Sequence, residues 1–377
     1  MKRFVRPYEE AKPLFAERAR ERRNPMDHIV PEEALRVLDQ LNTLEYDAWA
    51  KAWMAAAEPH EERARQAEER GDTTAAREAY MFAYGFHRVA RYPCMSSPAK
   101  RDAYRKSQEM FMKAGLYMDP PVERVEMPFK GRPGEGSASI GLLRRPKADR
   151  KLPVVVAWGG IDSFKEERRI EPFLAKGFAG LTIDMPGVAD APLAGSEDAE
   201  RMWDAVFDWI AVQPYLDARK VVLWGGSTGG YWAAKVAHTH RDRVAAVLEQ
   251  GGAIHYAFQP DWIEEAQRGE YPFELAETLS CAFGGSGFDY WVERAPKLSL
   301  LDQGVLDQPC APMLCVNGLH DSIFPVADQY LLLEHGSPKS IRLYNTGHMG
   351  HEPRTMGDML AWVETIIPSP AGGRGVG

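Results

Sequence analysis

The sequence lacks several features that would point to a membrane, a metal site or nucleic acid. Cysteine is scarce, with 4 in 377 residues, and no two cysteines have the C-x-x-C spacing typical of zinc or redox sites. No stretch of about 18 consecutive apolar residues is present, so we expect no membrane span. The net charge is -8, and this balance disfavours nucleic acid as a partner because phosphate binding depends on clustered lysine and arginine.

A secretory leader is also not expected. Residues 1–4 are followed by charged residues instead of an apolar region of about 7 to 15 residues. We therefore expect a cytoplasmic location, where cysteine thiols stay reduced. The four thiols expected to be reduced are Cys94, Cys281, Cys310 and Cys315.

The composition that is present is that of an ordinary globular protein. Apolar residues make up 45% of the chain and charged residues 27%, which argues against disorder. A chain of 377 residues has room for two domains of roughly 150 residues each, or for one α/β domain with a large addition. The change in sequence pattern near residue 119 favours two parts of different character.

The first part, residues 1–118, is predicted to be a helical cap domain. It lacks strand-like alternation and has apolar residues at helical spacing. The turn at 71–74 interrupts this pattern. Asp72 or Thr73 can cap the aromatic-rich helix that follows over 75–92. Because an amphipathic helical arm before a catalytic core often packs against a second subunit, we expect a homodimer.

Residues 119–368 are predicted to form an α/β-hydrolase catalytic domain. Short apolar runs alternate with helix-like segments, which is typical of a mainly parallel sheet covered by helices on both faces. The eight expected strands are 122–129, 139–143, 152–157, 179–183, 221–224, 244–248, 313–316 and 341–344. Residues 252–308 contain no clear strand and are expected to form an insertion of helices and loops over the active-site mouth. The glycine-rich residues 369–377 are expected to be a flexible tail.

A candidate nucleophile follows the fifth of these strands. The sequence Gly225-Gly226-Ser227-Thr228-Gly229 has the G-x-S-x-G pattern of a nucleophile elbow. In such an elbow, a strained strand-to-helix turn presents the serine hydroxyl above the sheet, and the flanking glycines let the backbone pass closely. A glycine-rich turn is also common in other parallel α/β proteins, so the pattern gains weight only from catalytic partners.

The partners of Ser227 are predicted in the chain order expected of this fold, which is serine, acid, histidine. Asp321 follows the strand at 313–316, and His348 follows the last strand. The imidazole activates the hydroxyl by taking its proton, and the carboxylate orients the imidazole and stabilises its charged form. The sequence therefore predicts a Ser227-Asp321-His348 triad.

Three other residues compete for these roles. His351 lies close to His348 but directly precedes the closing helix, so it is interpreted as structural. His320, beside Asp321, is interpreted as a loop residue. Glu249 ends the sixth strand and is a second candidate acid, which either supports the histidine or bonds loop amides.

The oxyanion hole requires two backbone donors. Thr228, the residue after the nucleophile, is expected to supply the first. The amide of Gly160, in the loop after the third strand, is expected to supply the second, because glycine lets an acyl oxygen approach the backbone. Further along this loop, residues 163–166 fit a capping box for a helix expected over 166–176. Asp162 either caps the same helix or faces the substrate pocket.

Four features of the sequence are shared with one known family. They are the loop Gly159-Gly160-Ile161-Asp162-Ser163-Phe164-Lys165-Glu166-Glu167, the elbow, Asn317-Gly318 with Asp321, and the helical N-terminal third. Together they resemble the FrsA-like α/β-hydrolases, and within them the branch of 2,6-dihydroxypseudooxynicotine hydrolase and the fungal pigment polyketide-shortening hydrolases. One departure is Ala189, at a position where loops of this kind often have a second glycine; we expect it to shift a pocket wall without touching the triad.

The resemblance implies a hydrolase without a metal or an organic cofactor. Ser227 would be the nucleophile, Asp321 the acid and His348 the base, with the amides of Gly160 and Thr228 as oxyanion donors. Some members of the family cleave esters, whereas members of the closer branch cleave a carbon-carbon bond next to a ketone.

Aromatic residues near the elbow and in the insertion are candidate walls of a pocket for an aromatic substrate, and each is also a candidate core residue. They are Tyr231, Trp232, His255, Tyr256, Trp262, Tyr290 and Trp291. The candidates for substrate contact or for support of the catalytic residues are Asp162, Glu249, Tyr231, Trp232 and His255.

The predicted function is hydrolysis at the carbonyl carbon of a small molecule, aromatic or polyketide-like, by a serine nucleophile. The bond broken is that of an ester or a carbon-carbon bond of a ketone. Three alternatives stay open: a general carboxylesterase, an acyltransferase with the same triad, and a non-catalytic regulatory binding protein on a hydrolase fold.

Overall fold

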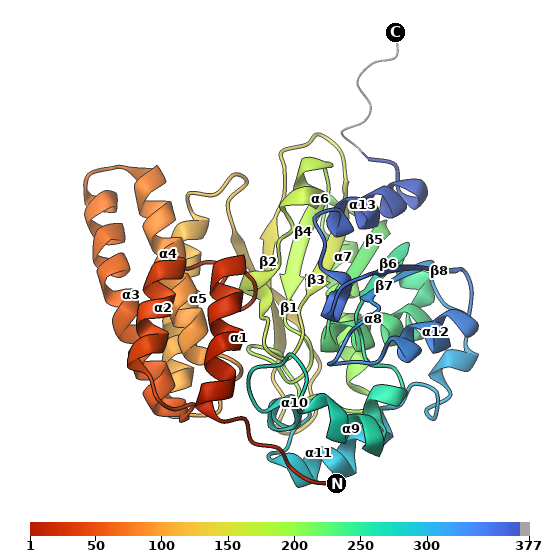
Figure 1. Ribbon diagram of the computed structural model, residues 1–377. Coiled ribbons are helices and arrows are strands. Elements are labelled where there is room, and N and C mark those ends of the chain that lie inside the picture. The colour runs from red at the N-terminus through yellow and green to blue at the C-terminus, as the bar shows by residue number, and fades with distance from the viewer. Residues whose placement is uncertain (370–377) are drawn as a thin grey trace. The chain divides into compact units, whose positions relative to one another are not determined.

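The computed structural model describes residues 1–369 and divides into two compact units (Figure 1). The helical unit comprises residues 4–123 and 270–278. The sheet unit comprises residues 1–3, 124–269 and the chain from 279 onward. The tail expected at 369–377 lies outside the described residues, apart from Ser369.

The units differ in three ways from the predicted division of the chain. Residues 1–3 belong to the sheet unit and not to the helical unit. The predicted boundary lies at residue 118, whereas the helical unit runs to residue 123. The prediction also assigns all of 252–308 to the catalytic domain, whereas residues 270–278 belong to the helical unit. A segment from the second half of the sequence is therefore part of the N-terminal unit.

The N-terminal helical region expected from the sequence is confirmed. Its helices, red to orange in Figure 1, are α1 (Tyr8–Glu21), α2 (Pro31–Gln40), α3 (Tyr46–Glu69), α4 (Thr73–Arg91) and α5 (Pro98–Gly115). Of the two candidate caps of α4, Asp72 is the N-cap, and its carboxylate accepts the amide of Ala75 at 3.0 Å. Such a cap satisfies an amide that the first helical turn leaves without a partner.

The core of the helical unit is aromatic. Trp49 of α3 lies against Phe15 of α1 with ring centroids 4.8 Å apart, and both rings are fully buried. Phe273, from the segment 270–278, meets Trp49 edge to face at 5.4 Å and lies 5.9 Å from Tyr92. Edge-to-face contacts add to the stabilisation that burial provides. The segment 270–278 therefore completes a core built mainly by the N-terminal helices.

The sheet unit contains the predicted sheet of eight mainly parallel strands. They are β1 (Glu123–Pro128), β2 (Ala138–Arg144), β3 (Leu152–Trp158), β4 (Ala179–Ile183), β5 (Leu216–Gly226), β6 (Ala246–Gln250), β7 (Met313–Gly318) and β8 (Lys339–Tyr344). Their order is β1-β2-β4-β3-β5-β6-β7-β8. β2 is antiparallel to β4, and the pairs from β4-β3 to β7-β8 are parallel. The loops after the parallel strands therefore meet at one edge.

Helices pack on both faces of this sheet (Figure 1). The helices are α6 (Glu171–Ala175), α7 (Met202–Val212), α8 (Thr228–Thr239), α12 (Val326–Glu334) and α13 (Thr355–Ile366). On the face shared by α6 and α13, Phe173 lies 5.8 Å from Trp224 of β5. On the other, Trp203 of α7 contacts Trp158 of β3 at 4.9 Å and Trp232 of α8 at 5.9 Å. Burial on both faces explains why β3 is a continuous apolar run.

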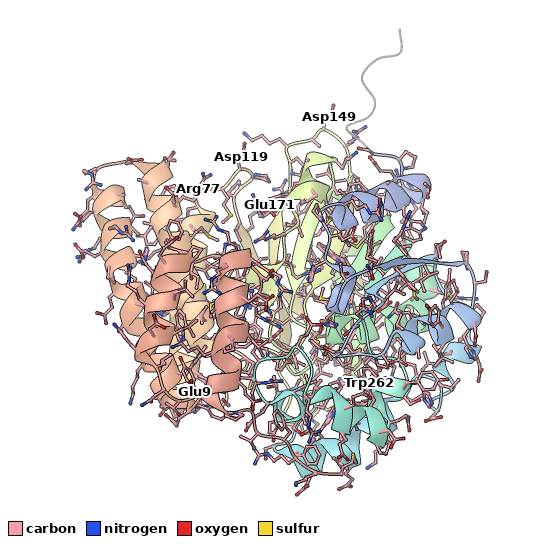
Figure 2. All side chains as sticks on the ribbon, in the orientation of Figure 1. Glu9, Arg77, Asp119, Asp149, Glu171 and Trp262 are labelled. Atoms are coloured by element: carbon pink, nitrogen blue, oxygen red, sulfur yellow. The ribbon has the colours of Figure 1, made fainter. Side chains whose placement is uncertain are left out.

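The insertion at 252–308 consists of helices and loops and contains no strand, as expected. Its α-helices are α9 (Pro260–Ala266), α10 (Leu275–Ala282) and α11 (Phe288–Arg294). Trp262 of α9, labelled in Figure 2, donates its indole N–H to the carbonyl of Ile323 at 2.9 Å. This bond ties α9 to the loop after β7, which carries Asp321.

The helix expected over 166–176 is wrong in its extent. The chain forms a 3-10 turn over Lys165–Glu167, and α6 begins only at Glu171, labelled in Figure 2. The capping box expected at 163–166 is also wrong, because the 3-10 turn has Phe164 as its N-cap and no side-chain cap bond.

An ion cluster around the buried Lys165 explains this departure. Nζ of Lys165 lies 2.9 Å from Asp184, 2.7 Å from Asp190 and 3.1 Å from Glu166. The cluster joins the loops after β3 and β4, and buried charges of opposite sign must stay together. In the second of these loops Ala189 has φ 47°, a conformation that favours glycine.

Residues 1–369 contain neither a candidate membrane span nor a candidate metal site. No helix there has both the length and the apolar character needed to cross a bilayer. No group of three or more histidine, cysteine, aspartate and glutamate side chains there is arranged to hold a metal ion.

Candidate active site

Ser227 lies in the sharp turn between β5, which ends at Gly226, and α8, which begins at Thr228. Its backbone has φ 57° and ψ -132°, a conformation that residues with a side chain rarely adopt. A Cβ at Gly225 would lie 2.2 Å from the carbonyl oxygen of Gly229, so the close passage of the backbone requires glycine. This strained turn has the geometry of a nucleophile elbow.

The register of the sheet brings the loops after β5, β7 and β8 together. Gly226 pairs with Gln250 of β6, which in turn pairs with Val316 of β7. Gly318 at the end of β7 pairs with Tyr344 at the end of β8. Because these strands are parallel, the loops that carry the serine, the acid and the histidine leave the same edge of the sheet.

The three predicted catalytic residues form one chain of contacts. Nε2 of His348 lies 2.8 Å from Oγ of Ser227, and Nδ1 of His348 lies 2.8 Å from Oδ2 of Asp321. Since the carboxylate only accepts, Nδ1 carries the proton, and Nε2 is left to accept the proton of the serine hydroxyl. His348, and not His320 or His351, therefore occupies the position beside the hydroxyl.

Asp321 accepts hydrogen bonds at both carboxylate oxygens. Oδ1 accepts the amides of Ile323 at 2.8 Å and Phe324 at 3.0 Å. Oδ2 accepts Nδ2 of Asn317 at 2.9 Å in addition to His348. Donors aimed at both oxygens stabilise the carboxylate and hold it in one orientation. The Phe324 ring also packs on the imidazole, with ring centroids 5.6 Å apart.

Asn317 links the loop after β7, which carries Asp321, to the loop after β8, which carries His348. Besides its bond to Asp321, its Oδ1 accepts the amide of Gly318 at 2.8 Å and that of Met349, the residue after His348, at 2.9 Å. Sequence reasoning used Asn317 only as part of a family motif. An Asn-Gly pair indicates a turn, and it does not reveal a bond to a distant loop.

Gln250 is a second residue whose role the sequence analysis missed. Its backbone carbonyl accepts the amide of Ser227 at 2.8 Å. Its side chain accepts Nε1 of Trp224 at 3.0 Å and donates to the carbonyl of Met349 at 2.9 Å. Gln250 therefore links the turn that carries Ser227 to the loop that carries His348. In the sequence, only its position at the end of a strand indicates this role.

Glu249, the second candidate acid, is engaged elsewhere. Its Oε1 accepts the amide of Gly252 at 2.5 Å and Nε2 of Gln329 at 3.3 Å. Its Oε2 has no hydrogen-bond partner among residues 1–369. Burial raises the pKa of Glu249 to about 8. A carboxyl group that is mostly neutral at pH 7 and bonded to a loop amide favours support of that loop over orientation of His348.

The predicted oxyanion donors lie beside Ser227, the predicted nucleophile. Thr228 is the first residue of α8, and an amide at that position has no acceptor within its own helix. A Cβ at Gly160 would lie 3.0 Å from Oγ of Ser227 and 3.3 Å from the amide nitrogen of Thr228. The missing side chain leaves space between the hydroxyl and the Thr228 amide, which is where an oxyanion hole is required.

The remaining candidates take other positions. Tyr231 and Trp232 are fully buried, with ring centroids 4.7 Å apart, and this packing gives both a structural role. Nδ1 of His255 lies 2.7 Å from Oγ of Ser299 in the insertion. Asp162 is buried and is not the N-cap of the 3-10 turn that follows it. Contact of Asp162 or His255 with substrate stays a prediction.

Comparison with known proteins gives one family and several relatives. A family model described as Esterase FrsA-like matches residues 30–363. Hydrolase ORFZ of Pyricularia oryzae is 30% identical over 242 residues, which cover 58% of this chain and 56% of that protein. Esterase FrsA of Photobacterium profundum is 24% identical over 328 residues, which cover 84% of this chain and 76% of that one. The chain therefore spans little more than half the length of the fungal relative.

Solved structures give the same fold. The 2,6-dihydroxy-pseudo-oxynicotine hydrolase has a TM-score of 0.71 at 22% identity, covering 92% of this chain and 95% of that one. Wild-type AbyA5 has a TM-score of 0.70 at 22% identity, covering 89% of each chain. This likeness confirms the predicted α/β-hydrolase fold. Because the family model extends over most of the sequence, the chain belongs to the FrsA-like esterase family.

Proposed function

We propose that the chain is a serine hydrolase that attacks the carbonyl carbon of a small, aromatic or polyketide-like substrate. One observation carries this proposal: His348 makes two contacts of 2.8 Å, one with Oγ of Ser227 and one with Oδ2 of Asp321. A serine hydroxyl is a weak nucleophile until a base takes its proton, and the base works best when a carboxylate orients it.

In the first half of the proposed reaction, the hydroxyl proton of Ser227 moves to Nε2 of His348 while Oγ attacks the carbonyl carbon. The carbonyl oxygen becomes an oxyanion, to which the amides of Gly160 and Thr228 donate. Asp321 stabilises the imidazolium. The bond to the leaving group then breaks, and the leaving group takes the proton from Nε2.

Water completes the proposed reaction. It attacks the acyl group on Ser227 while His348 accepts its proton, and the proton then returns to Oγ as the acid product leaves. The residues of this chain supply the nucleophile, the base and the oxyanion donors, and no step calls on a metal or an organic cofactor.

The proposal covers two kinds of bond. In an ester the leaving group is an alkoxide or phenoxide. In a ketone it is a carbanion, which must be stabilised as an enolate or by an electron-poor or phenolic ring. The family description names an esterase, and the fungal relative is named only as a hydrolase, so both bonds belong to the proposal.

Replacement of the nucleophile tests the proposal. Ser227→Ala should lower kcat/KM on p-nitrophenyl acetate, or on an aryl β-diketone, at least about a thousandfold, since only binding and oxyanion stabilisation remain. Ser196→Ala is the matched control, because the hydroxyl of Ser196 donates to Asp198, two residues further along the chain, at 2.8 Å and not to a residue of the proposed triad. Retention of more than about a tenth of the wild-type rate in Ser227→Ala would contradict the assignment.

The alternatives to this function give different results in the same assays. Turnover of the acetate ester far above that of any aryl β-diketone indicates a general carboxylesterase. Ester products formed with added alcohols indicate an acyltransferase. A cellular function that survives Ser227→Ala indicates a non-catalytic binding protein.

A homodimer and a cytoplasmic location are also part of the proposal. They are supported by the amphipathic N-terminal helices and by the scarcity of cysteine. Light scattering of the purified chain measures the first, and fractionation of the source cells measures the second.

A further inference from the structure

Arg168 is an arginine of the sheet unit that has no carboxylate partner among residues 1–369. It lies between the 3-10 turn Lys165–Glu167 and α6. Its guanidinium carbon is 3.9 Å from the centroid of the Trp224 ring. Its Nε and Nη2 atoms are enclosed and have no acceptor in the described part of the chain.

Another arginine of the same unit shows the usual arrangement. Arg294 donates its two terminal nitrogens to the two oxygens of Glu197, at 2.7 and 2.6 Å. Such a two-point pair compensates a guanidinium for the water that it loses. In the described part of the chain, Arg168 faces the ring of Trp224, which attracts a cation but does not accept its N–H groups in the plane.

An unpaired cation in this position has a cost. Burial lowers the pKa of Arg168 to about 9, and no nearby carboxylate opposes the effect of burial. Enclosed polar groups in proteins nearly always have partners, and those without one call for an explanation. A ligand that supplies the missing acceptor is such an explanation.

The position of Arg168 points to a ligand in the candidate active site. A Cβ at Gly226, the residue before Ser227, would lie 3.1 Å from Nη1 of Arg168 and 2.7 Å from Cε of Met349, the residue after His348. Since consecutive Cα atoms are about 3.8 Å apart, Nη1 lies within about 9 Å of the Cα of Ser227. The guanidinium is therefore beside both the turn that carries Ser227 and the loop that carries His348.

The guanidinium is held in place while part of it stays accessible. Trp224 is buried, and Nε1 of its ring donates to Gln250 at 3.0 Å, which fixes the surface on which Arg168 stacks. The Arg168 side chain is only partly buried, and Nη1 is not among its enclosed atoms. A planar fork held on a fixed ring has little freedom left to lose when it binds.

We infer that Arg168 binds a carboxylate of the substrate beside Ser227. This inference rests on the proposed function and narrows its substrate class to carboxylated carbonyl compounds. A guanidinium matches the two oxygens of a carboxylate in geometry and charge. The loop that carries the proposed oxyanion donor Gly160 then also carries the group that selects the substrate.

A pair of esters tests the inference in catalysis. The mono-p-nitrophenyl ester of glutaric acid carries a free carboxylate, and p-nitrophenyl acetate does not. We expect the wild type to prefer the carboxylated ester in kcat/KM, and Arg168→Gln to lose about 10- to 100-fold more on that ester than on the acetate. Arg168→Lys keeps the charge without the planar fork. Its preference for the carboxylated ester should therefore fall between those of the wild type and Arg168→Gln.

A binding measurement separates this inference from the proposed chemistry. Calorimetry on Ser227→Ala compares benzoate with benzamide, which has nearly the same shape but no charge. We expect benzoate to bind at least about tenfold more tightly, and Ser227→Ala with Arg168→Gln to lose this preference. If neither an ester nor an aryl β-diketone is hydrolysed, the proposed function fails, whereas the binding result still decides the role of Arg168.

Stability separates a binding role from a structural one. Removal of an unpaired, enclosed cation should leave the Tm of Arg168→Gln equal to or above that of the wild type. The matched control is Arg243→Gln, because Arg243 also lies over a ring, that of Phe207, but is paired with Asp208 at 2.8 Å. We expect this control to leave the benzoate preference unchanged.

Three outcomes would overturn the inference. They are equal binding of benzoate and benzamide, a benzoate preference that survives Arg168→Gln, and an Arg168→Gln variant that melts earlier and loses both esters in equal proportion.

Discussion

Two buried carboxyl groups lie at the ends of neighbouring strands near Ser227, and their surroundings differ. Asp321, after β7, accepts two backbone amides, the side chain of Asn317 and the imidazole of His348. Glu249, in β6, accepts one amide and one glutamine side chain, and its Oε2 has no partner in the described residues.

The backbone explains the difference. Asp321 stands in a loop, where the amides of Ile323 and Phe324 turn back toward its side chain. Glu249 stands within a strand, where neighbouring strands take up the backbone amides. Burial disfavours the charged form of any carboxyl group, and directed donors restore it. Burial of a carboxyl group near a serine is therefore a poor guide to a catalytic acid. The number and direction of the hydrogen-bond donors that surround the carboxyl group are a better guide.

The largest effect on activity is expected when Asp321, the proposed catalytic acid, is replaced. Asp321→Asn should lower kcat/KM about a thousandfold or more, because an asparagine NH2 group in place of Oδ2 no longer accepts the Nδ1 proton of His348. Glu249→Gln, the matched carboxyl-to-amide change, should cost less than about fivefold. Assays of both variants on one p-nitrophenyl ester compare them directly, and the reverse order would move the catalytic acid to β6.

A smaller effect on activity is expected from replacing Asn317, which donates a hydrogen bond to Asp321. Asn317→Ala removes one hydrogen bond to Asp321 and the link to the Met349 amide, so kcat should fall about tenfold with KM little changed. Asn345→Ala is the control, because Asn345 bonds the exposed His320 at 2.7 Å. A wild-type kcat in Asn317→Ala would show that the remaining donors suffice to orient Asp321.

The smallest effect on activity, but a measurable one on stability, is expected at Glu249. Its pKa is about 8 in the folded chain against an ordinary value of 4.5, so between these values the folded state holds the extra proton. The contribution of Glu249 to the free energy of unfolding is full below pH 4.5. It is lost as pH rises through 8, at up to about 1.4 kcal/mol per pH unit. Glu249→Gln should flatten this decline.

Urea denaturation at several pH values checks this prediction. Asp328 and Lys339 are the charged groups that act on Glu249, and both remain in the variant, so the difference between the two profiles isolates Glu249. Parallel stability profiles for the wild type and Glu249→Gln would show that Glu249 titrates normally.

Local chemistry explains what sequence reasoning predicted. The strands are apolar runs because both faces of the sheet are covered, and the elbow is visible because its backbone passes so closely that glycine is required at Gly225. Ser227, Asp321 and His348 are found from chain order because each follows a parallel strand. Asp72 is found as a cap because a cap bonds only a few residues ahead.

Contacts between distant segments explain what sequence reasoning missed. Asn317 and Gln250 act through bonds to Met349 in another loop. Phe273 belongs to the core of the helical unit although it lies in the second half of the chain. The expected capping box fails because Lys165 bonds two aspartates from the loop after the next strand in the chain.

The sequence by itself determined the class of fold and the three residues of the candidate triad, because the spacing of apolar residues and glycines and the order of motifs along the chain are present before folding. The family was indicated by the motifs that the chain shares with it. Tertiary structure decided which of two buried carboxyl groups contacts His348 and which asparagine and glutamine link the loops around Ser227. It also decided that Nε and Nη2 of Arg168 are enclosed without a carboxylate partner among residues 1–369. These features depend on directed hydrogen bonds and on burial, which exist only once distant strands are in register.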